Sequence, residues 1–248
     1  MEDLIASPSH SLVAQSLHAT ESKSETNGDG FGIGWYGARP APGLYREVRP
    51  AWSDENLRSL CAQVEARLFF AHVRAATGTA TTRANCHPFA EGRLLFMHNG
   101  QIGGFAAIRR RVEAMIPDPL YPSRTGTTDS EAIFLSAVGL GLAEEPLCAI
   151  ATVLSRVREE MARAQVAAPL RFTAALTDGA HLWAFRWASD DAPPTLYFRD
   201  GCYDDGAKGL VVVSEPIDGK RQDWHAVPPG HALIAAPDGS KKLALLEV

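Results

Sequence analysis

Three groups of polar residues, spaced between positions 74 and 129 of the sequence, could together bind an amino acid that carries a side-chain amide. Arg74 directly follows the apolar run Leu-Phe-Phe-Ala-His-Val, which predicts a buried strand. A guanidinium there suits a carboxylate, because its planar fork can donate two parallel hydrogen bonds. Asn99-Gly100 follows a second apolar run, and a turn there would aim an amide and a backbone N–H into one oxyanion hole. Asp129, at a predicted helix start, can present a carboxylate to an ammonium group.

Each of these groups also has an ordinary structural explanation. Asn-Gly most often simply forms a turn, and an aspartate at a helix start is most often a cap. Arg74 could belong to a structural ion pair. The combination and its order favour the functional interpretation over the separate structural ones.

Other chemistries find little support in the sequence. The segment 32–37 matches G-x-G-x-x-G, but the proline-containing stretch 38–43 after it cannot form the helix that a dinucleotide site requires. A strand over 31–36 whose glycines permit close backbone approach is the simpler interpretation. His72 and Cys86-His87 offer at most part of a metal site, and zinc needs three or four ligands. We therefore expect no metal and no cofactor.

Apolar periodicity and turn residues predict an α+β fold in one domain over 1–248. Helices cluster in the middle of the chain, and hairpins follow them, which favours antiparallel sheets over βαβ units. The expected helices begin near Ser53, Gly104 and Thr128, and a fourth covers 146–163. The expected strands cover 31–36, 67–74, 93–98, 171–177, 181–187, 195–199, 209–214, 231–235 and 242–247.

Composition excludes several classes of protein. The chain has 248 residues and a formal net charge of −5, which argues against a dedicated nucleic-acid binder. No apolar run approaches the roughly 20 residues of a membrane span. The acidic N-terminus lacks the features of a secretory signal, so we expect a cytoplasmic protein with four reduced cysteines.

The motifs resemble those of the class II glutamine amidotransferases, N-terminal-nucleophile (Ntn) enzymes with a four-layer αββα sandwich of two antiparallel sheets. The resemblance is closest to the stand-alone bacterial type, and it covers nearly the whole chain. It implies a single glutaminase-like domain over 1–248. The matching stretches are 27–36, 70–77, 85–89, 98–100, 128–131, 214–216 and 227–231.

The resemblance implies a role for each matching site residue. Arg74, helped by Thr77, would hold the α-carboxylate of glutamine, and Asp129 would bind its α-ammonium group. The Asn99 amide and the Gly100 N–H would form the oxyanion hole. The resemblance also implies that His87 shapes the loop over the pocket.

The family nucleophile is a cysteine at the mature N-terminus, whose own α-amine acts as general base. Its thiolate attacks the amide, and water hydrolyses the γ-glutamyl thioester or ammonia passes to an acceptor. Position 2 is Glu2, so the sequence departs from this pattern. We expect that the domain is truncated at its N-terminus by about one strand, and that this chain is inactive as written.

Several alternatives stay open at this point. The protein is either a truncated enzyme, a degenerate member that kept its pocket, or one with a replacement nucleophile. It could be an inactive amino-acid-binding or regulatory module, or a γ-glutamyl amidohydrolase acting on a larger metabolite. The expected partners are glutamine or a γ-glutamyl substrate, and a separate acceptor subunit is an option. We expect no nucleic acid and no membrane.

Overall fold

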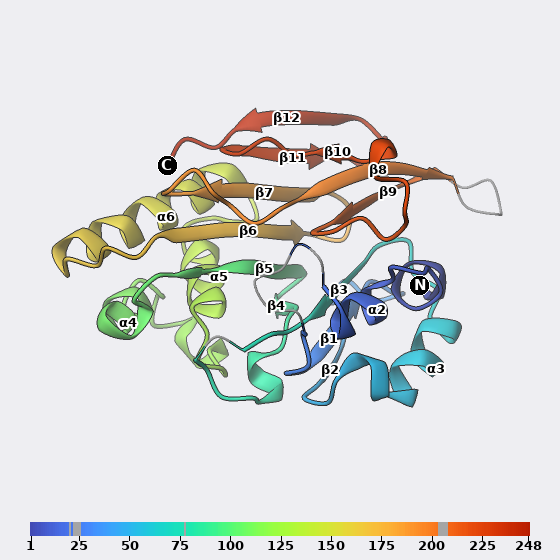
Figure 1. Ribbon diagram of the computed structural model, residues 1–248. Helices are drawn as coiled ribbons and strands as arrows, with labels where there is room; N and C mark the ends of the chain where they lie inside the picture. The colour runs from blue at the N-terminus through green and yellow to red at the C-terminus, as the bar shows by residue number, and fades with distance from the viewer. Residues whose placement is uncertain (20, 22–25, 77, 203–207) are drawn as a thin grey trace.

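A six-stranded antiparallel sheet is the largest element of the computed structural model, which describes residues 1–19, 21, 26–76, 78–202 and 208–248. Figure 1 shows the strands in the order β12-β11-β7-β6-β5-β4. Their bounds are β4 Phe89–Glu91, β5 Leu94–Ile102, β6 Leu170–Thr177, β7 Leu182–Ala188, β11 His231–Ala235 and β12 Lys241–Leu245.

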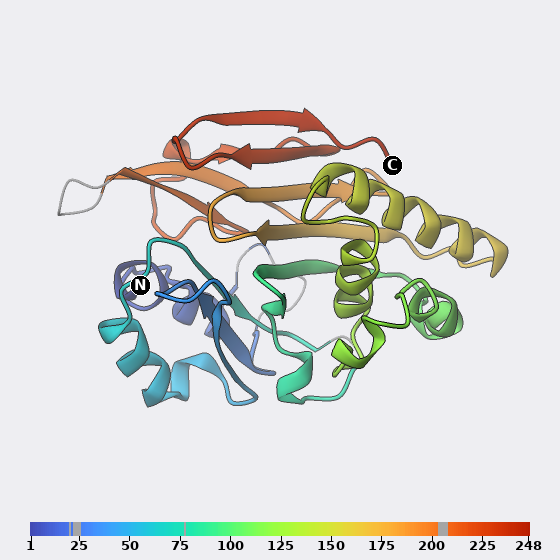
Figure 2. The same ribbon diagram turned by 180° about the vertical axis from the view of Figure 1, so that it is seen from behind.

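Three helices cover one face of this sheet, and Figure 2 shows α5 and α6 in front of its strands. Phe96 of β5 stacks on Phe134 of α5 with ring centroids 5.1 Å apart, and on Phe172 of β6 at 6.3 Å. This interface holds the largest buried apolar cluster among the described residues. The helices are α4 Phe105–Glu113, α5 Asp129–Val138 and α6 Pro146–Arg163.

Two three-stranded antiparallel sheets lie against the opposite face. One has the order β2-β1-β3 and contacts the large sheet through Phe70, Leu95 and Ala175. The other has the order β10-β8-β9 and packs near Leu196 and Leu233. Their strands are β1 Phe31–Trp35, β2 Gly43–Glu47, β3 Phe69–Val73, β8 Tyr197–Cys202, β9 Lys208–Val213 and β10 His225–Ala226.

A second helical layer covers the outer face of β2-β1-β3. It buries Ile5, Phe31 and Leu57 in one cluster. Asp54 caps α3, since its side chain accepts a hydrogen bond from the Leu57 N–H at 2.7 Å. These helices are α1 Glu2–Ile5, α2 Leu12–Leu17 and α3 Glu55–Gln63, and short 3-10 helices cover Ala51–Ser53, Arg83–Asn85, Tyr121–Ser123 and Arg221–Asp223.

The layers therefore follow the order α, β, β, α, which confirms the predicted α+β sandwich. The sheets are antiparallel, as expected, and the second β layer consists of the two separate sheets β2-β1-β3 and β10-β8-β9. Within the described part of the chain, no helix is long and apolar enough to cross a membrane.

The largest difference from the sequence prediction concerns Asn99-Gly100. We expected the strand to end at residue 98 and a turn to follow, and this prediction was wrong. The strand β5 continues to Ile102, and Asn99 and Gly100 pair with Thr173 and Phe172 of β6. The strand continues because β6 pairs with β5 from Leu95 to Ile102. This pairing outweighs the turn preference of the Asn-Gly dipeptide.

Candidate functional site

A cavity of about 2750 Å³ lies between the two β layers and brings most of the expected site residues together. Arg74 reaches it from the end of β3, and Asn99 and Gly100 from β5. Asp129 and His87 also line it. Thr77 lies outside the residues that the structure describes.

The Arg74 guanidinium is buried in this cavity without a carboxylate partner among the described residues. Its residue is 4% exposed. Nη2 donates to Thr79 Oγ1 at 2.6 Å and to the Ala80 carbonyl at 3.4 Å, and Nη1 donates to the Asp29 carbonyl at 3.2 Å. A buried charge held only by neutral acceptors is costly, so the site favours an anionic ligand.

Asp129 is held at the other side of the cavity, in the first turn of α5. Thr128, rather than Asp129, is the N-cap. The Asp129 carboxylate accepts hydrogen bonds from the Ile102 N–H at 2.7 Å and from the Ser130 N–H at 2.9 Å. These bonds fix the orientation of the carboxylate, and each of its oxygens retains lone pairs for a ligand donor.

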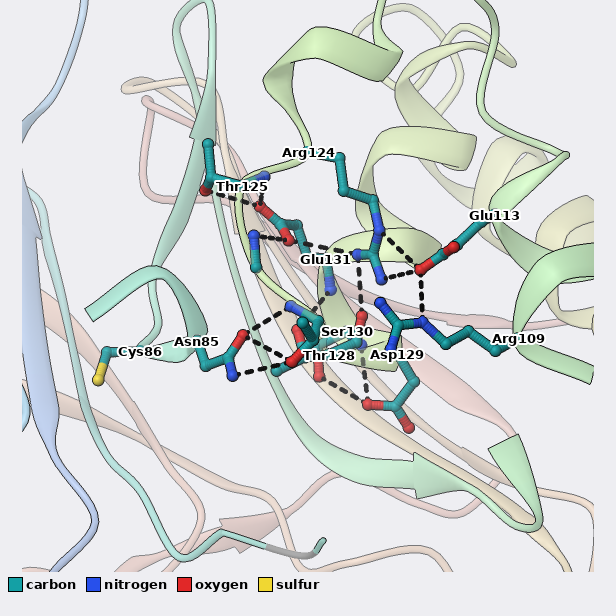
Figure 3. Close-up of polar contacts among 12 residues, drawn as sticks. Asn85, Cys86, Arg109, Glu113, Arg124, Thr125, Thr128, Asp129, Ser130 and Glu131 are labelled. Atoms are coloured by element: carbon teal, nitrogen blue, oxygen red, sulfur yellow. Dashed lines mark hydrogen bonds and ion pairs between the residues drawn. The ribbon is translucent and has the colours of Figure 1, made fainter. Parts of the chain in front are cut away.

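A buried ion-pair network supports the loop that leads to Asp129 (Figure 3). The Arg124 side chain, 5% exposed, bridges Glu113 at 2.7 Å and Glu131 at 3.2 Å. Glu131 also accepts hydrogen bonds from the backbone N–H groups of Thr125 and Gly126. No local pattern in the sequence indicated this role of Arg124, although a glutamate at position 131 among apolar helix residues indicates a buried partner.

Asn99 faces the cavity because side chains alternate along β5. Leu95 and Met97 belong to the cluster between the β layers, whereas Phe96 packs against the helices. Asn99 shares the phase of the former pair and is exposed to the cavity. At Gly100, a Cβ atom would lie 2.1 Å from the Arg171 carbonyl oxygen, so only glycine permits this approach of β6.

Three histidines lie beside these residues, of which His87 and His98 are buried and His72 is partly buried. The His87 ring is 4.4 Å from that of His72 and 4.6 Å from that of Phe89. Burial lowers the pKa of His72 to about 4 and that of His87 well below its usual range, so both are neutral at pH 7. His98 Nδ1 lies 2.8 Å from Ser130 Oγ. The positive charge in this part of the cavity therefore comes from Arg74.

The glycines of β1 give the loop at His87 its close fit. A Cβ atom at Gly32 would lie 2.2 Å from the His87 carbonyl oxygen, and one at Gly34 would lie 2.8 Å from Pro88 Cγ. The predicted use of the glycine run, close backbone approach within a strand, is confirmed. Within the described residues, no group of three or more His, Cys, Asp and Glu side chains is arranged to hold a metal ion.

No cysteine side chain among those described lies ready as a nucleophile beside Arg74. Burial raises the pKa of the Cys61 and Cys86 thiols. The Cys86 sulfur lies 3.5 Å from the carbonyl oxygens of Glu47 and Thr82. Cys148 is exposed on α6 and does not line the cavity.

The cavity continues as a slot between two strand edges. It follows residues 68–75, which include β3, and residues 209–214, which include most of β9. In the described ranges, β3 pairs only with β1 and β9 only with β8, so each has one edge without a strand partner. Leu4 and Ile5 line the slot from the helical side, and Met97, Ala175 and Leu182 line it from the six-stranded sheet.

Comparisons with known proteins agree with this geometry. Residues 2–199 match the family model described as glutamine amidotransferases class-II. The chain is 29% identical to the probable glutamine amidotransferase DUG3 of Saccharomyces cerevisiae, over 94% of this chain and 77% of that protein. It is 26% identical to the gamma-glutamyl-hercynylcysteine sulfoxide hydrolase of Mycolicibacterium smegmatis, over 93% of this chain and 88% of the relative.

A solved structure shares the fold over nearly the whole chain. It is the glutamine aminotransferase class-II domain protein from Silicibacter pomeroyi, with a TM-score of 0.74 and 40% sequence identity. The match covers 88% of this chain and 91% of the solved one. The sequence, the layers and the cavity thus agree with one family.

Proposed function

Because this chain belongs to the class II glutamine amidotransferases, we propose that its cavity binds glutamine or a γ-glutamyl amide. We propose further that it hydrolyses the amide through a γ-glutamyl thioester once an N-terminal cysteine is supplied. The observation that carries the binding proposal is the buried Arg74 guanidinium, which has no carboxylate partner among the described residues. Without that cysteine, the chain binds substrate and does not turn it over.

In this proposal the two charged groups of the amino acid select the ligand. Arg74 holds the α-carboxylate, because its fork can replace neutral acceptors with a charge-assisted pair. Asp129 accepts hydrogen bonds from the α-ammonium group through the lone pairs that its two backbone bonds leave free. Thr77 assists Arg74, and His87 shapes the loop over the bound ligand.

The proposed reaction follows from the position of Asn99. The cysteine thiolate forms a bond to the amide carbon, and the side-chain amide of Asn99 with the Gly100 N–H stabilises the oxyanion. The cysteine α-amine takes the thiol proton and passes it to the departing nitrogen, which leaves as ammonia. Water then cleaves the thioester to release glutamate and the thiol.

We propose that the slot between β3 and β9 holds one additional strand, which precedes the described residues and begins with that cysteine. Both facing edges lack a strand partner among the described residues, and apolar side chains line the slot from both layers. Unpaired backbone groups favour such a partner, because each buried unsatisfied group costs about 1–3 kcal/mol. With this strand, 1–248 forms the body of a single domain.

The test is to place Met-Cys and a strand of apolar residues before the chain, remove the initiator Met and measure ammonia release from glutamine. We expect release from the extended protein and none from the chain as written. An extended protein with an N-terminal serine serves as the matched control. Saturable binding without release by the cysteine form would support an amino-acid-binding module instead.

A larger γ-glutamyl substrate is the second candidate, and similarity to one relative supports it. The Mycolicibacterium relative is named as a hydrolase of a γ-glutamyl compound. Competition between glutamine and γ-glutamyl dipeptides separates the two candidates. Transfer of ammonia to a separate acceptor subunit would appear as release that depends on an added partner.

A further inference from the structure

We propose that Asn85 is a positioning residue that sets the Arg74 site at a fixed separation from the Asp129 site. This inference rests on the proposed binding of an α-amino acid. Arg74 extends from the sheet β2-β1-β3, whereas Asp129 begins a helix packed on the six-stranded sheet. A ligand that carries both charged groups can bind both sites only if the Arg74 guanidinium and the Asp129 carboxylate lie at a fixed distance that suits it.

On the carboxylate side, Asn85 and Arg74 share an acceptor. Asn85 Nδ2 donates to the Ala80 carbonyl at 2.8 Å, and Arg74 Nη2 donates to the same oxygen at 3.4 Å. Arg74 Nη2 also donates to Thr79 Oγ1, one residue earlier. The position of the segment Thr79–Ala80 therefore depends on Asn85 and determines where the guanidinium lies.

On the ammonium side, Asn85 holds the loop that leads into α5 (Figure 3). Its Oδ1 accepts a hydrogen bond from the Thr127 N–H at 2.7 Å, and Nδ2 donates to Thr127 Oγ1 at 3.0 Å. Thr127 lies two residues before Asp129. A Cβ atom at Gly126 would lie 2.6 Å from Asn85 Oδ1, so the loop packs closely on the amide.

Because Asn85 is buried, its hydrogen bonds hold the two segments firmly in place. The residue is 1% exposed, and its amide nitrogen and oxygen bond to two segments that are 47 residues apart in sequence, Ala80 and Thr127. Water cannot readily replace these bonds in a buried site, so both segments are held at the separation that one side chain imposes. Loss of the amide frees each segment, so the distance between the Arg74 guanidinium and the Asp129 carboxylate is no longer fixed, although both side chains remain present.

A ligand with two charged groups is sensitive to this separation, and a ligand with one group is not. The advantage of joining two binding groups depends on how well the sites are preorganised. Glutamine carries both groups. Glutaramate lacks only the α-ammonium group, and 4-aminobutanamide lacks only the α-carboxylate. Binding of these three compounds therefore distinguishes the effect of the distance between the two sites from the affinity of each site alone.

The experiment titrates the chain and its variants with the three compounds by calorimetry, with displacement for the weak ones. We expect Asn85→Ala to weaken glutamine binding by about ten- to a hundredfold. We expect it to change binding of each one-group compound by less than about threefold. Asn85→Leu keeps a similar side-chain volume, adds no charge and loses the hydrogen bonds to both Ala80 and Thr127, so it should act in the same direction. Thr82→Ala, an exposed change in the same turn, is the matched control.

The possible results separate this inference from the proposed function. Equal losses for all three compounds, or no loss for glutamine in either Asn85 variant, would overturn the positioning role. If Asn85→Ala fails to fold, Asn85→Leu decides the question by the same comparison. Failure of the unmodified chain to bind glutamine would instead refute the proposed function, and the positioning role with it.

Discussion

The two β layers of this protein differ in how completely their strands are paired. The six-stranded sheet is continuous from β12 to β4, and three helices bury the large apolar cluster against it. The opposite layer is divided between β3 and β9, and the cavity follows both open edges. The expected ligand-binding residues gather where the pairing stops. The continuous layer supplies rigidity, and the divided one supplies space and unsatisfied polar groups.

The largest effects should come from the continuous layer. We expect Phe134→Ala to lower the free energy of unfolding by about 3–5 kcal/mol, because the ring is 1% exposed and stacked on Phe96. Phe70→Ala, beside the slot, should cost at least about 1 kcal/mol less, because Phe70 lines the cavity and is 5% exposed. Denaturant unfolding of both variants provides the measurement. Equal losses would show that the slot is as well packed as the core.

Two buried arginines give the same contrast in charge. Arg124→Met removes the partner of two glutamates and should cost about 3–5 kcal/mol of folding free energy. Arg74→Met removes a charge without a carboxylate partner in the described residues, so the loss should stay below about 1 kcal/mol. Urea titration compares the two directly. A larger loss at Arg74 than at Arg124 would mean that Arg74 is a structural group.

Backbone amides should report the open edges. In the chain as written, we expect the slot-facing N–H groups of β3 and β9 to exchange hydrogen faster than those of β5 and β6. Addition of the proposed strand should slow the exchange of the β3 and β9 groups by roughly tenfold or more. The paired groups of β5 and β6 serve as the internal control. Unchanged exchange in β3 and β9 would contradict the strand proposal.

The smallest expected effect is a pH dependence that comes from the buried histidines. The pKa of His72 is lowered to about 4, below its unfolded value, so the unfolded state binds more protons between these values. Stability is therefore fully present above pH 6.5 and is lost as the pH falls toward 4. We expect a loss on the order of 1–3 kcal/mol. His72→Asn should reduce it, whereas His225→Asn, an exposed change on β10, should not. An identical pH profile in His72→Asn would assign the loss to other groups.

The sequence predicted those parts of the fold that local patterns determine. The helix expected over 146–163 matches α6, because its apolar stripe and proline start are local features. The strand over 231–235 matches β11 for the same reason. The strand that contains Asn99-Gly100 was predicted too short, because its continuation depends on the partner β6, which lies about 70 residues away in the sequence.

The candidate site divides in the same way. Residue types alone indicated Arg74, Asn99 and Asp129, and these side chains do line one cavity. The support behind them was not predictable, since Arg124 and Asn85 gain their partners only through tertiary folding. Nor did the sequence show that Cys148 on α6 would be exposed. The contacts of Arg124 and Asn85 join segments that are separated in the sequence, so no local pattern predicts them.

The most direct test of the account is a calorimetric titration of the unmodified chain and of Arg74→Met with glutamine, with ammonia measured in the same samples. We expect saturable binding by the unmodified chain and no ammonia. We expect Arg74→Met to remain folded and to lose this binding by at least about a hundredfold, because a buried partner of a charged group is removed. Equal glutamine binding by the two proteins, or no binding by either, would contradict the claim that Arg74 marks an amino-acid site.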